Sequence, residues 1–150
     1  MSKGGWSISQ DLVSTIEEFI PKGSKILEFG SGEGTKSLVD AGYDMFSVEE
    51  DIRFSGLFHN QYCHAEIKDG WYDLDKVKSF LEGKRFHAVL IDGPAHGERM
   101  KILETGIDFQ QFKVIIVDDI ERKEDAELFS ILSNGKKFKQ TETYGIIFND

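Results

Sequence analysis

The chain has 150 residues, the length of one domain (residues 1–150), and its 39% hydrophobic content is enough for a single core. The formal net charge of -9 disfavours a nucleic-acid backbone or an anionic membrane surface as the main partner. No apolar run approaches the roughly 20 residues of a membrane span, and no signal-peptide core follows Met1, so we expect a cytoplasmic protein.

The first third of the chain predicts two helices that alternate with two strands. Ser9 is a good N-cap for the first helix, and Pro21 ends it. The second strand runs into an acidic segment that begins at Glu49. The four elements are expected at residues 9–20, 26–29, 35–40 and 45–48.

The rest of the chain continues this alternation. Gly56 interrupts a weak helical segment, and a weak strand comes after it. Asp73 caps a clearer helix that Gly83 closes. Two strands joined by a turn at residues 142–143 follow the last helix. The helices are expected at residues 52–58, 74–81, 96–105 and 126–132, and the strands at residues 62–65, 86–91, 112–117, 137–141 and 144–148.

Strands that alternate with helices predict right-handed crossovers and a parallel sheet covered on both faces. The strands near residues 26, 45, 86 and 112 are nearly continuous apolar runs, as expected for buried parallel strands. The terminal pair of strands adds an antiparallel hairpin at one edge. The predicted fold class is therefore α/β, a doubly wound, mostly parallel sheet with a C-terminal antiparallel hairpin.

A glycine-rich loop, EFGSGEGT at residues 28–35, follows the first strand. Glycine lets the backbone approach a ligand closely, and the next helix aims its N–H groups into the same space. The dinucleotide fingerprint needs a third glycine at the position of Thr35, so this loop departs from it. The carboxylate two residues before the first glycine suits an amino-acid ligand, and we expect Glu28 to lie near its ammonium group.

Carboxylates mark the ends of four predicted strands: Glu28, Glu49, Asp92 and Asp118. In a parallel sheet these ends share one edge, where ligands bind. Glu49 ends the second strand about 20 residues after the glycine loop, where an acid accepts both ribose hydroxyls of a nucleoside. The sequence therefore predicts a nucleoside site and leaves NAD and S-adenosylmethionine open.

The glycine loop, FSVE at residues 46–49, VLIDGP at residues 89–94 and IIVDD at residues 115–119 together resemble the motifs of a class I S-adenosylmethionine-dependent methyltransferase. The resemblance covers residues 9–148 and implies a Rossmann-like methyltransferase fold with S-adenosylmethionine as cofactor. His64 and Ala65 fall where the family usually carries an acid that contacts adenine, so the histidine departs from that pattern. The resemblance assigns cofactor contacts to Glu28, Gly30, Ser31, Gly32, Gly34, Thr35, Glu49, Glu50, His64, Ala65 and Asp92.

Asp92, Asp118 and Asp119 are expected to form a carboxylate cluster at the ends of two strands. Cys63 is the only cysteine, which excludes a cysteine metal cluster, whereas hard oxygen ligands suit Mg²⁺ or another divalent cation. The cluster resembles the metal site of catechol O-methyltransferases, in which an amide replaces Asp119. A helix cap by Asp118 or Asp119 is the alternative interpretation.

The candidate catalytic residues are Asp92, His96 and Arg99, which follow the strand beside the expected donor. His96 suits a general base, because an unperturbed imidazole titrates near neutral pH. Arg99 suits a bidentate contact to an acidic acceptor. His96 and Arg99 are equally compatible with ordinary surface positions. Trp71 and Tyr72 are interpreted as edge packing rather than as ligand contacts.

The favoured hypothesis is a methyltransferase for the hydroxyl group of a small-molecule acceptor, with a divalent cation as an optional assistant. Glu28 and the missing third glycine disfavour an NAD-linked oxidoreductase. A non-catalytic nucleoside-binding or scaffold module with the same fold is the main alternative, because the chain has little room for a substrate-binding cap. A second subunit would supply such a cap, so a homodimer is a further hypothesis.

Overall fold

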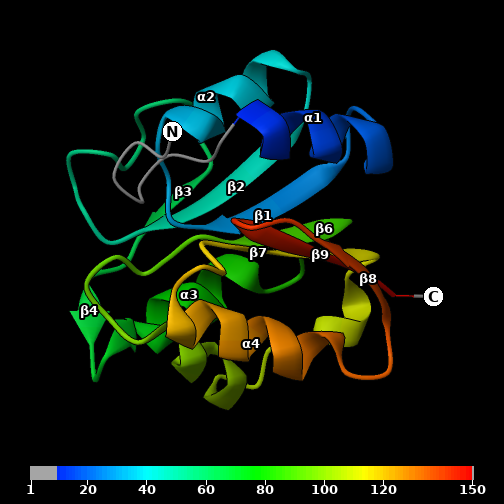
Figure 1. Cartoon of the computed structure of the whole chain (residues 1–150). Helices are drawn as coiled ribbons and strands as arrows, with labels where there is room; N and C mark the ends of the chain where they lie inside the picture. The colour runs from blue at the N-terminus through cyan, green and yellow to red at the C-terminus, as the bar shows by residue number, and fades with distance from the viewer. Residues whose placement is uncertain (1–9, 150) are drawn as a thin grey trace.

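A mixed sheet forms the centre of the computed structural model, which describes residues 10–149 (Figure 1). Within these residues the sheet has seven strands in the order β3-β2-β1-β6-β7-β9-β8. The pairs from β3 to β7 are parallel, whereas β9 pairs antiparallel with both of its neighbours. The strands are β1 (Lys25–Phe29), β2 (Asp44–Glu49), β3 (Tyr62–His64), β6 (Ala88–Ile91), β7 (Val114–Asp118), β8 (Lys137–Gln140) and β9 (Tyr144–Phe148). This arrangement confirms the predicted doubly wound sheet and its C-terminal hairpin.

The chain winds outward from β1 in one direction and from β6 in the other. The β1, β2 and β3 strands follow one another toward one edge, and β6 then pairs with the opposite side of β1. The order of the strands therefore reverses between β1 and β6. In open α/β sheets such a reversal opens a crevice at the carboxyl ends of the two strands.

Helices cover both faces of the sheet, as Figure 1 shows. The α1 (Gln10–Phe19) and α2 (Glu33–Asp40) helices lie on one face, and α3 (Leu74–Leu81) and α4 (Lys123–Ser133) lie on the other. Side chains of β1 alternate between two apolar clusters: Ile26 packs with the α1 layer, and Leu27 packs with the α4 layer. Among the described residues, no helix is both long and apolar enough to cross a membrane.

Two predicted helices are wrong or shortened. Residues 52–58 form successive turns rather than a helix, and Ile52 and Leu57 are exposed, so no apolar face drives helix formation there. Residues 96–105 contain only the 3-10 helix η1 (Arg99–Glu104). A second 3-10 helix, η2 (Phe109–Gln111), was not predicted. The expected N-cap at Ser9 lies outside the described residues.

Two short strands, β4 (Ile67–Lys68) and β5 (Trp71–Tyr72), form a separate antiparallel hairpin that the sequence analysis missed. The turn residues Asp69 and Gly70 have positive φ angles of 57° and 86°. An Asp-Gly pair is a strong signal for a two-residue hairpin turn, because both central positions require a positive φ. This hairpin brings Tyr72 to the centre of the fold, where its side chain is buried.

Candidate functional site

The carboxyl ends of β1, β2 and β6 border a cavity of about 510 Å³. Seven residues that the sequence singled out line this cavity, and they come from three separate segments. They are Gly30, Ser31, Glu49, Glu50, Asp92, His96 and Arg99. A second cavity, of about 490 Å³, opens beside Phe86 and Phe112, at the amino ends of β6 and β7. Because α/β sheets bind ligands at the carboxyl ends of their strands, we assign the candidate site to the first cavity.

Gly30 lets the end of β1 approach the segment after β6 closely. Its φ of +94° is a backbone conformation that residues with a side chain rarely adopt. A Cβ atom at this position would also overlap the carbonyl oxygen of Asp92. The N–H of Gly30 donates to the carbonyl oxygen of Val48, 2.8 Å away. Glycine at this position therefore joins three strand ends at the floor of the cavity.

Glu49 is held in place by two backbone N–H groups. Its Oε1 accepts a hydrogen bond from the N–H of Ser31 and its Oε2 from the N–H of Asp51, both at 2.8 Å. Each carboxylate oxygen keeps a second lone pair for a ligand. Burial raises the pKa of Glu49, although both hydrogen bonds oppose this effect. Glu49 lines the cavity, and its contact to ribose hydroxyls stays a prediction.

Glu50 spans the mouth of the cavity. Its Oε1 accepts hydrogen bonds from the N–H groups of Ala95, at 2.8 Å, and His96, at 3.1 Å. Its Oε2 lies 3.2 Å from Nδ1 of His96, whose side chain is 83% exposed. Glu50 therefore positions the loop after β6, and His96 presents its ring at the entrance, where an acceptor would arrive.

Glu28 does not line the cavity, and the contact of its carboxylate to the ligand stays a prediction. Its Oε1 accepts hydrogen bonds from the hydroxyls of Thr35 and Ser47, both at 2.6 Å. Ser47 also contacts Nε2 of His59 at 2.7 Å, and the Nδ1 atom of His59 accepts from the N–H of Gln61. Burial raises the pKa of Glu28 to about 7 and lowers that of His59 to about 4. These hydrogen-bonded polar groups hold the glycine loop in place on the side away from the cavity.

The remaining loop residues also support the site rather than border it. Gly32 is the N-cap of α2, and its N–H donates to Oγ1 of Thr35 across 3.1 Å. Gly34 is buried in the first turn of α2. None of these three residues lines the cavity, and the cofactor contacts that the resemblance assigned to Gly32, Gly34 and Thr35 stay predictions.

His64 and Ala65 make hydrogen bonds within the protein, and their assignment to an adenine contact stays a prediction. The N–H of Ala65 donates to the carbonyl oxygen of Glu49 at 2.9 Å, where it extends the pairing of β2 with β3. Nε2 of His64 lies 3.1 Å from the carbonyl oxygen of Glu50. Neither residue lines the cavity.

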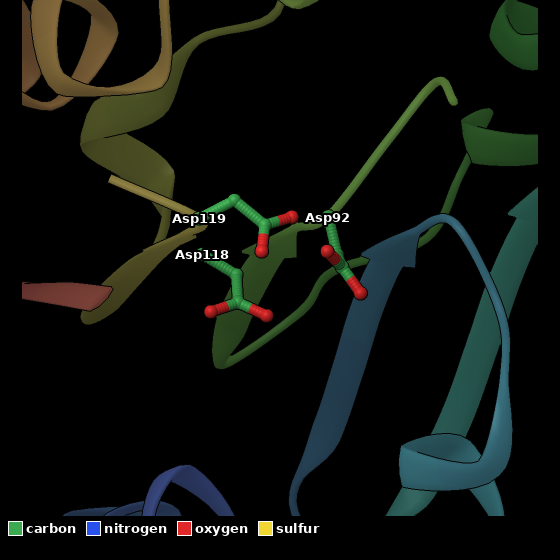
Figure 2. Close-up of side chains that lie close together, drawn as sticks. All are labelled: Asp92, Asp118 and Asp119. Carbon is green, nitrogen blue, oxygen red and sulfur yellow. The ribbon is translucent and has the colours of Figure 1, made fainter. Parts of the chain in front are cut away.

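Three carboxylates meet beside the cavity, as Figure 2 shows. Asp92 follows β6, Asp118 ends β7, and Asp119 comes next with a positive φ of 61°. One oxygen atom from each lies within 4.8 Å of the others. Burial, reinforced by Asp118 and Asp119, raises the pKa of Asp92 well above its usual value, and burial with Asp119 raises that of Asp118 to about 7. The predicted cluster therefore forms.

The cluster fits a divalent cation. Oδ1 of Asp92 is buried without a hydrogen-bond partner, so this oxygen is available as a ligand atom. Carboxylate oxygens are the donors that Mg²⁺, Mn²⁺ and Ca²⁺ prefer. Burial raises the pKa values of Asp92 and Asp118, and Arg99, whose Nη1 lies 3.9 Å from Oδ1 of Asp92, opposes this effect.

Arg99 is occupied by the protein's own oxygen atoms, which corrects the expectation that it holds an acceptor. Its side chain is 1% exposed, and Nη1 donates to Asp119 and Asp125, each at 3.1 Å. Nη2 and Nε donate to the carbonyl oxygens of Asp92 and Pro94. Arg99 therefore fixes the carboxylates from inside the fold.

Tyr72 lines the cavity although the sequence analysis assigned it to edge packing. The signal that could have placed it is the Asp-Gly turn at residues 69–70, because that turn sets the register of β4 against β5. Its hydroxyl is buried and has no hydrogen-bond partner.

No family model and no curated protein matches this chain in sequence. Among solved structures, it is similar to the MycE methyltransferase of the mycinamycin biosynthetic pathway, solved in complex with Mg and SAH. The TM-score is 0.58 with 10% identity, over 97% of this chain and 49% of that chain. The chain thus spans about half the length of MycE.

Two further structures of similar size resemble the chain. The C-terminal domain of precorrin-6Y C5,15-methyltransferase from Rhodobacter capsulatus has a TM-score of 0.54 and 13% identity, over 93% of this chain and 88% of that chain. A TehB-like SAM-dependent methyltransferase from Corynebacterium glutamicum has a TM-score of 0.52 and 12% identity, over 91% of this chain and 86% of that chain. The chain has the fold of the class I S-adenosylmethionine-dependent methyltransferases.

Proposed function

We propose that this protein is an S-adenosylmethionine-dependent methyltransferase that methylates a hydroxyl group of a small molecule. The observation that carries the proposal is the cavity at the β1–β6 reversal, where the glycine loop and the fixed carboxylate of Glu49 face the same space. A carboxylate held in this way suits the two hydroxyls of a ribose. The fold shared with three methyltransferase structures supports the same conclusion.

Methyl transfer from a sulfonium is an in-line displacement, so the protein mainly positions the acceptor and accepts its proton. Asp92 is the candidate base inside the cavity, because its side chain lines the cavity and its Oδ1 has no hydrogen-bond partner among the described residues. His96 is the second candidate base, at the cavity entrance. An acceptor hydroxyl between them would lose its proton to one of these two groups.

Asp92, Asp118 and Asp119 are the residues that would hold a divalent cation. Such an ion would lower the pKa of an acceptor hydroxyl and orient it. Arg99 and Asp125 would keep Asp119 in place, since the guanidinium bridges the two carboxylates. The structure of MycE, which has a similar fold, was solved in complex with Mg and SAH. That complex supports the proposal of a divalent cation.

Isothermal titration calorimetry with S-adenosylhomocysteine, and with NAD as a second ligand, tests the proposal. We expect micromolar binding of S-adenosylhomocysteine alone. Glu49→Gln should weaken it strongly, because an amide replaces one acceptor oxygen with a donor. Glu127→Gln, on the exposed face of α4, is the matched control. Binding of NAD instead would support an oxidoreductase, and binding of neither ligand would leave a non-catalytic module as the better interpretation.

A further inference from the structure

The β4–β5 hairpin carries Tyr72 to the wall of the cavity. Its ring packs against Phe29 and Trp71, with centroids 5.9 Å and 5.1 Å away, and its side chain is 1% exposed. The hydroxyl reaches the backbone after β6, because a Cβ atom built on Gly93 would overlap Oη of Tyr72. Gly30 also approaches Gly93 closely, because the same Cβ atom would lie 3.1 Å from the Cα atom of Gly30. The hydroxyl therefore lies where the ends of β1 and β6 meet.

Among residues 10–149 the hydroxyl of Tyr72 has no hydrogen-bond partner, unlike those of the other tyrosines. The chain contains four tyrosines, all within the described residues. The hydroxyl of Tyr43 donates to the carbonyl oxygens of Ile16 and Ile20. The hydroxyl of Tyr62 contacts that of Ser31, and the hydroxyl of Tyr144 donates to a carboxylate. A buried polar group without a partner costs stability, so its retention at a cavity wall points to a partner that the bound ligand supplies.

The groups around this hydroxyl indicate the charge of that partner. Burial and the carboxylates of Glu49, Glu50 and Asp92 raise the pKa of Tyr72, so its hydroxyl stays neutral and its oxygen can accept a hydrogen bond. Arg99 acts in the opposite direction, and it is already engaged by Asp119 and other oxygens. Oδ1 of Asp92 is a second buried oxygen without a partner. This part of the wall thus offers acceptor oxygens and negative charge, and the guanidinium of Arg99 beside it is already engaged.

We propose that the hydroxyl oxygen of Tyr72 accepts a hydrogen bond from the ammonium group of the donor's amino-acid portion, a contact that the sequence analysis gave to Glu28. The inference rests on the proposed function, because it takes S-adenosylmethionine as the ligand. An ammonium group brings three N–H donors and a positive charge, and so satisfies Tyr72 in an acidic environment. Glu28 does not line the cavity, and its Oε1 is bonded to Thr35 and Ser47 beneath the loop, so we assign the contact to Tyr72 instead.

The test compares two ligands on Tyr72→Phe, by calorimetry in the presence of EDTA. The ligands are S-adenosylhomocysteine and its deaminated analogue, which lacks only the ammonium group. We expect the variant to bind S-adenosylhomocysteine about tenfold more weakly, the loss of one hydrogen bond to a charged group, and to bind the analogue as the wild type does. Tyr43→Phe, remote from the cavity, should bind both ligands like the wild type.

Thermal unfolding of the ligand-free variants provides a second readout. Tyr72→Phe keeps the ring packing and removes an unpartnered hydroxyl, so its melting temperature should equal or exceed that of the wild type. Tyr43→Phe removes hydrogen bonds to Ile16 and Ile20 and should melt at a lower temperature. A large loss of stability in Tyr72→Phe would mean that the hydroxyl has a structural partner, and it would overturn the inference.

The outcomes separate this inference from the proposed function. If the wild type does not bind S-adenosylhomocysteine, the proposed function fails and this inference fails with it. If the wild type binds and Tyr72→Phe binds equally well, only the inference is overturned. An equal loss for both ligands would place the hydroxyl against another part of the ligand and would also overturn it. A loss that appears only when Mg²⁺ replaces EDTA would assign Tyr72 to a metal site instead.

Discussion

The carboxylate of Glu28 accepts a hydrogen bond from the hydroxyl of Thr35 across 2.6 Å, beneath the glycine loop. Glu28 lies two residues after Ile26 in β1, so both side chains point to the same face of the sheet. Ile26 packs in the α1 layer on that face. The carboxylate of Glu28 therefore points under α2 rather than into the cavity. The acid of the glycine motif therefore fixes the loop in this protein. The cavity takes its negative charge from the ends of β2 and β6 instead.

Glu28→Gln should stabilise the protein at neutral and higher pH. The pKa of Glu28 rises from 4.5 to about 7 on folding, so between these values the folded state binds more protons and stability falls as the pH rises. Removing this charge should raise the free energy of unfolding by on the order of 2–3 kcal/mol at pH 8, and by much less at pH 5. Urea denaturation at both pH values measures the difference.

His59 contributes to pH dependence with the opposite sign, because its pKa falls to about 4 on folding. Its effect is common to the wild type and the variant, so the difference between them isolates Glu28. The affinity for S-adenosylhomocysteine should stay within about twofold in Glu28→Gln, since Glu28 does not line the cavity. A strong loss of affinity would restore Glu28 as a ligand contact.

Arg99→Met should lower the free energy of unfolding by about 3–5 kcal/mol, because it leaves the buried carboxylates of Asp119 and Asp125 without their cation. Arg53→Met is the control, since Arg53 pairs with Asp51 on the surface, and it should have no measurable effect. Adding Asp125→Asn to Arg99→Met should recover part of the loss. Chemical denaturation of the wild type, Arg99→Met, Arg53→Met, Asp125→Asn and the double variant would reveal additive costs if Arg99 and Asp125 were not coupled.

Gly30→Ala should destabilise the protein more than Gly23→Ala, although both glycines have a positive φ near 90°. Gly23 faces open space, so its substitution measures the backbone cost alone, about 1 kcal/mol. At Gly30 a Cβ atom would also overlap the carbonyl oxygen of Asp92, and we expect roughly 3 kcal/mol or more. Equal costs in denaturation experiments would show that β1 and β6 are not closely joined at this point.

Mg²⁺ should raise the melting temperature of the wild type, because binding to the folded state alone stabilises it. Asp118→Asn removes one of the three clustered carboxylates and should abolish this increase. Asp40→Asn removes an exposed carboxylate that pairs with Lys36, and it should retain the increase. If turnover is found with a hydroxyl substrate, Asp118→Asn should reduce it while binding of S-adenosylhomocysteine survives. A melting temperature insensitive to Mg²⁺ in the wild type would contradict the metal site.

The sequence by itself determined the doubly wound, mostly parallel sheet with its C-terminal hairpin, and the edge at which the carboxylates gather. Apolar runs of strand length alternate with helical patterns, and this alternation leaves few topologies for the chain. The acids that follow β2, β6 and β7 had to meet at one edge, since parallel strands end together. The clustering of Asp92, Asp118 and Asp119 follows from that rule and from the pairing of β6 with β7.

Only the tertiary structure decided which polar groups face the ligand. Arg99 meets Asp125 across 26 residues of sequence, and no local pattern specifies a contact of that range. The N–H of Ala65 and the carboxylate of Glu28 are taken by neighbours in space, so their resemblance to family positions does not make them ligand contacts. Tyr72 reaches the cavity because a two-residue turn folds back against Phe29. Sequence patterns set the face and end of each element, whereas the partners of a buried polar group depend on packing among segments far apart in the chain.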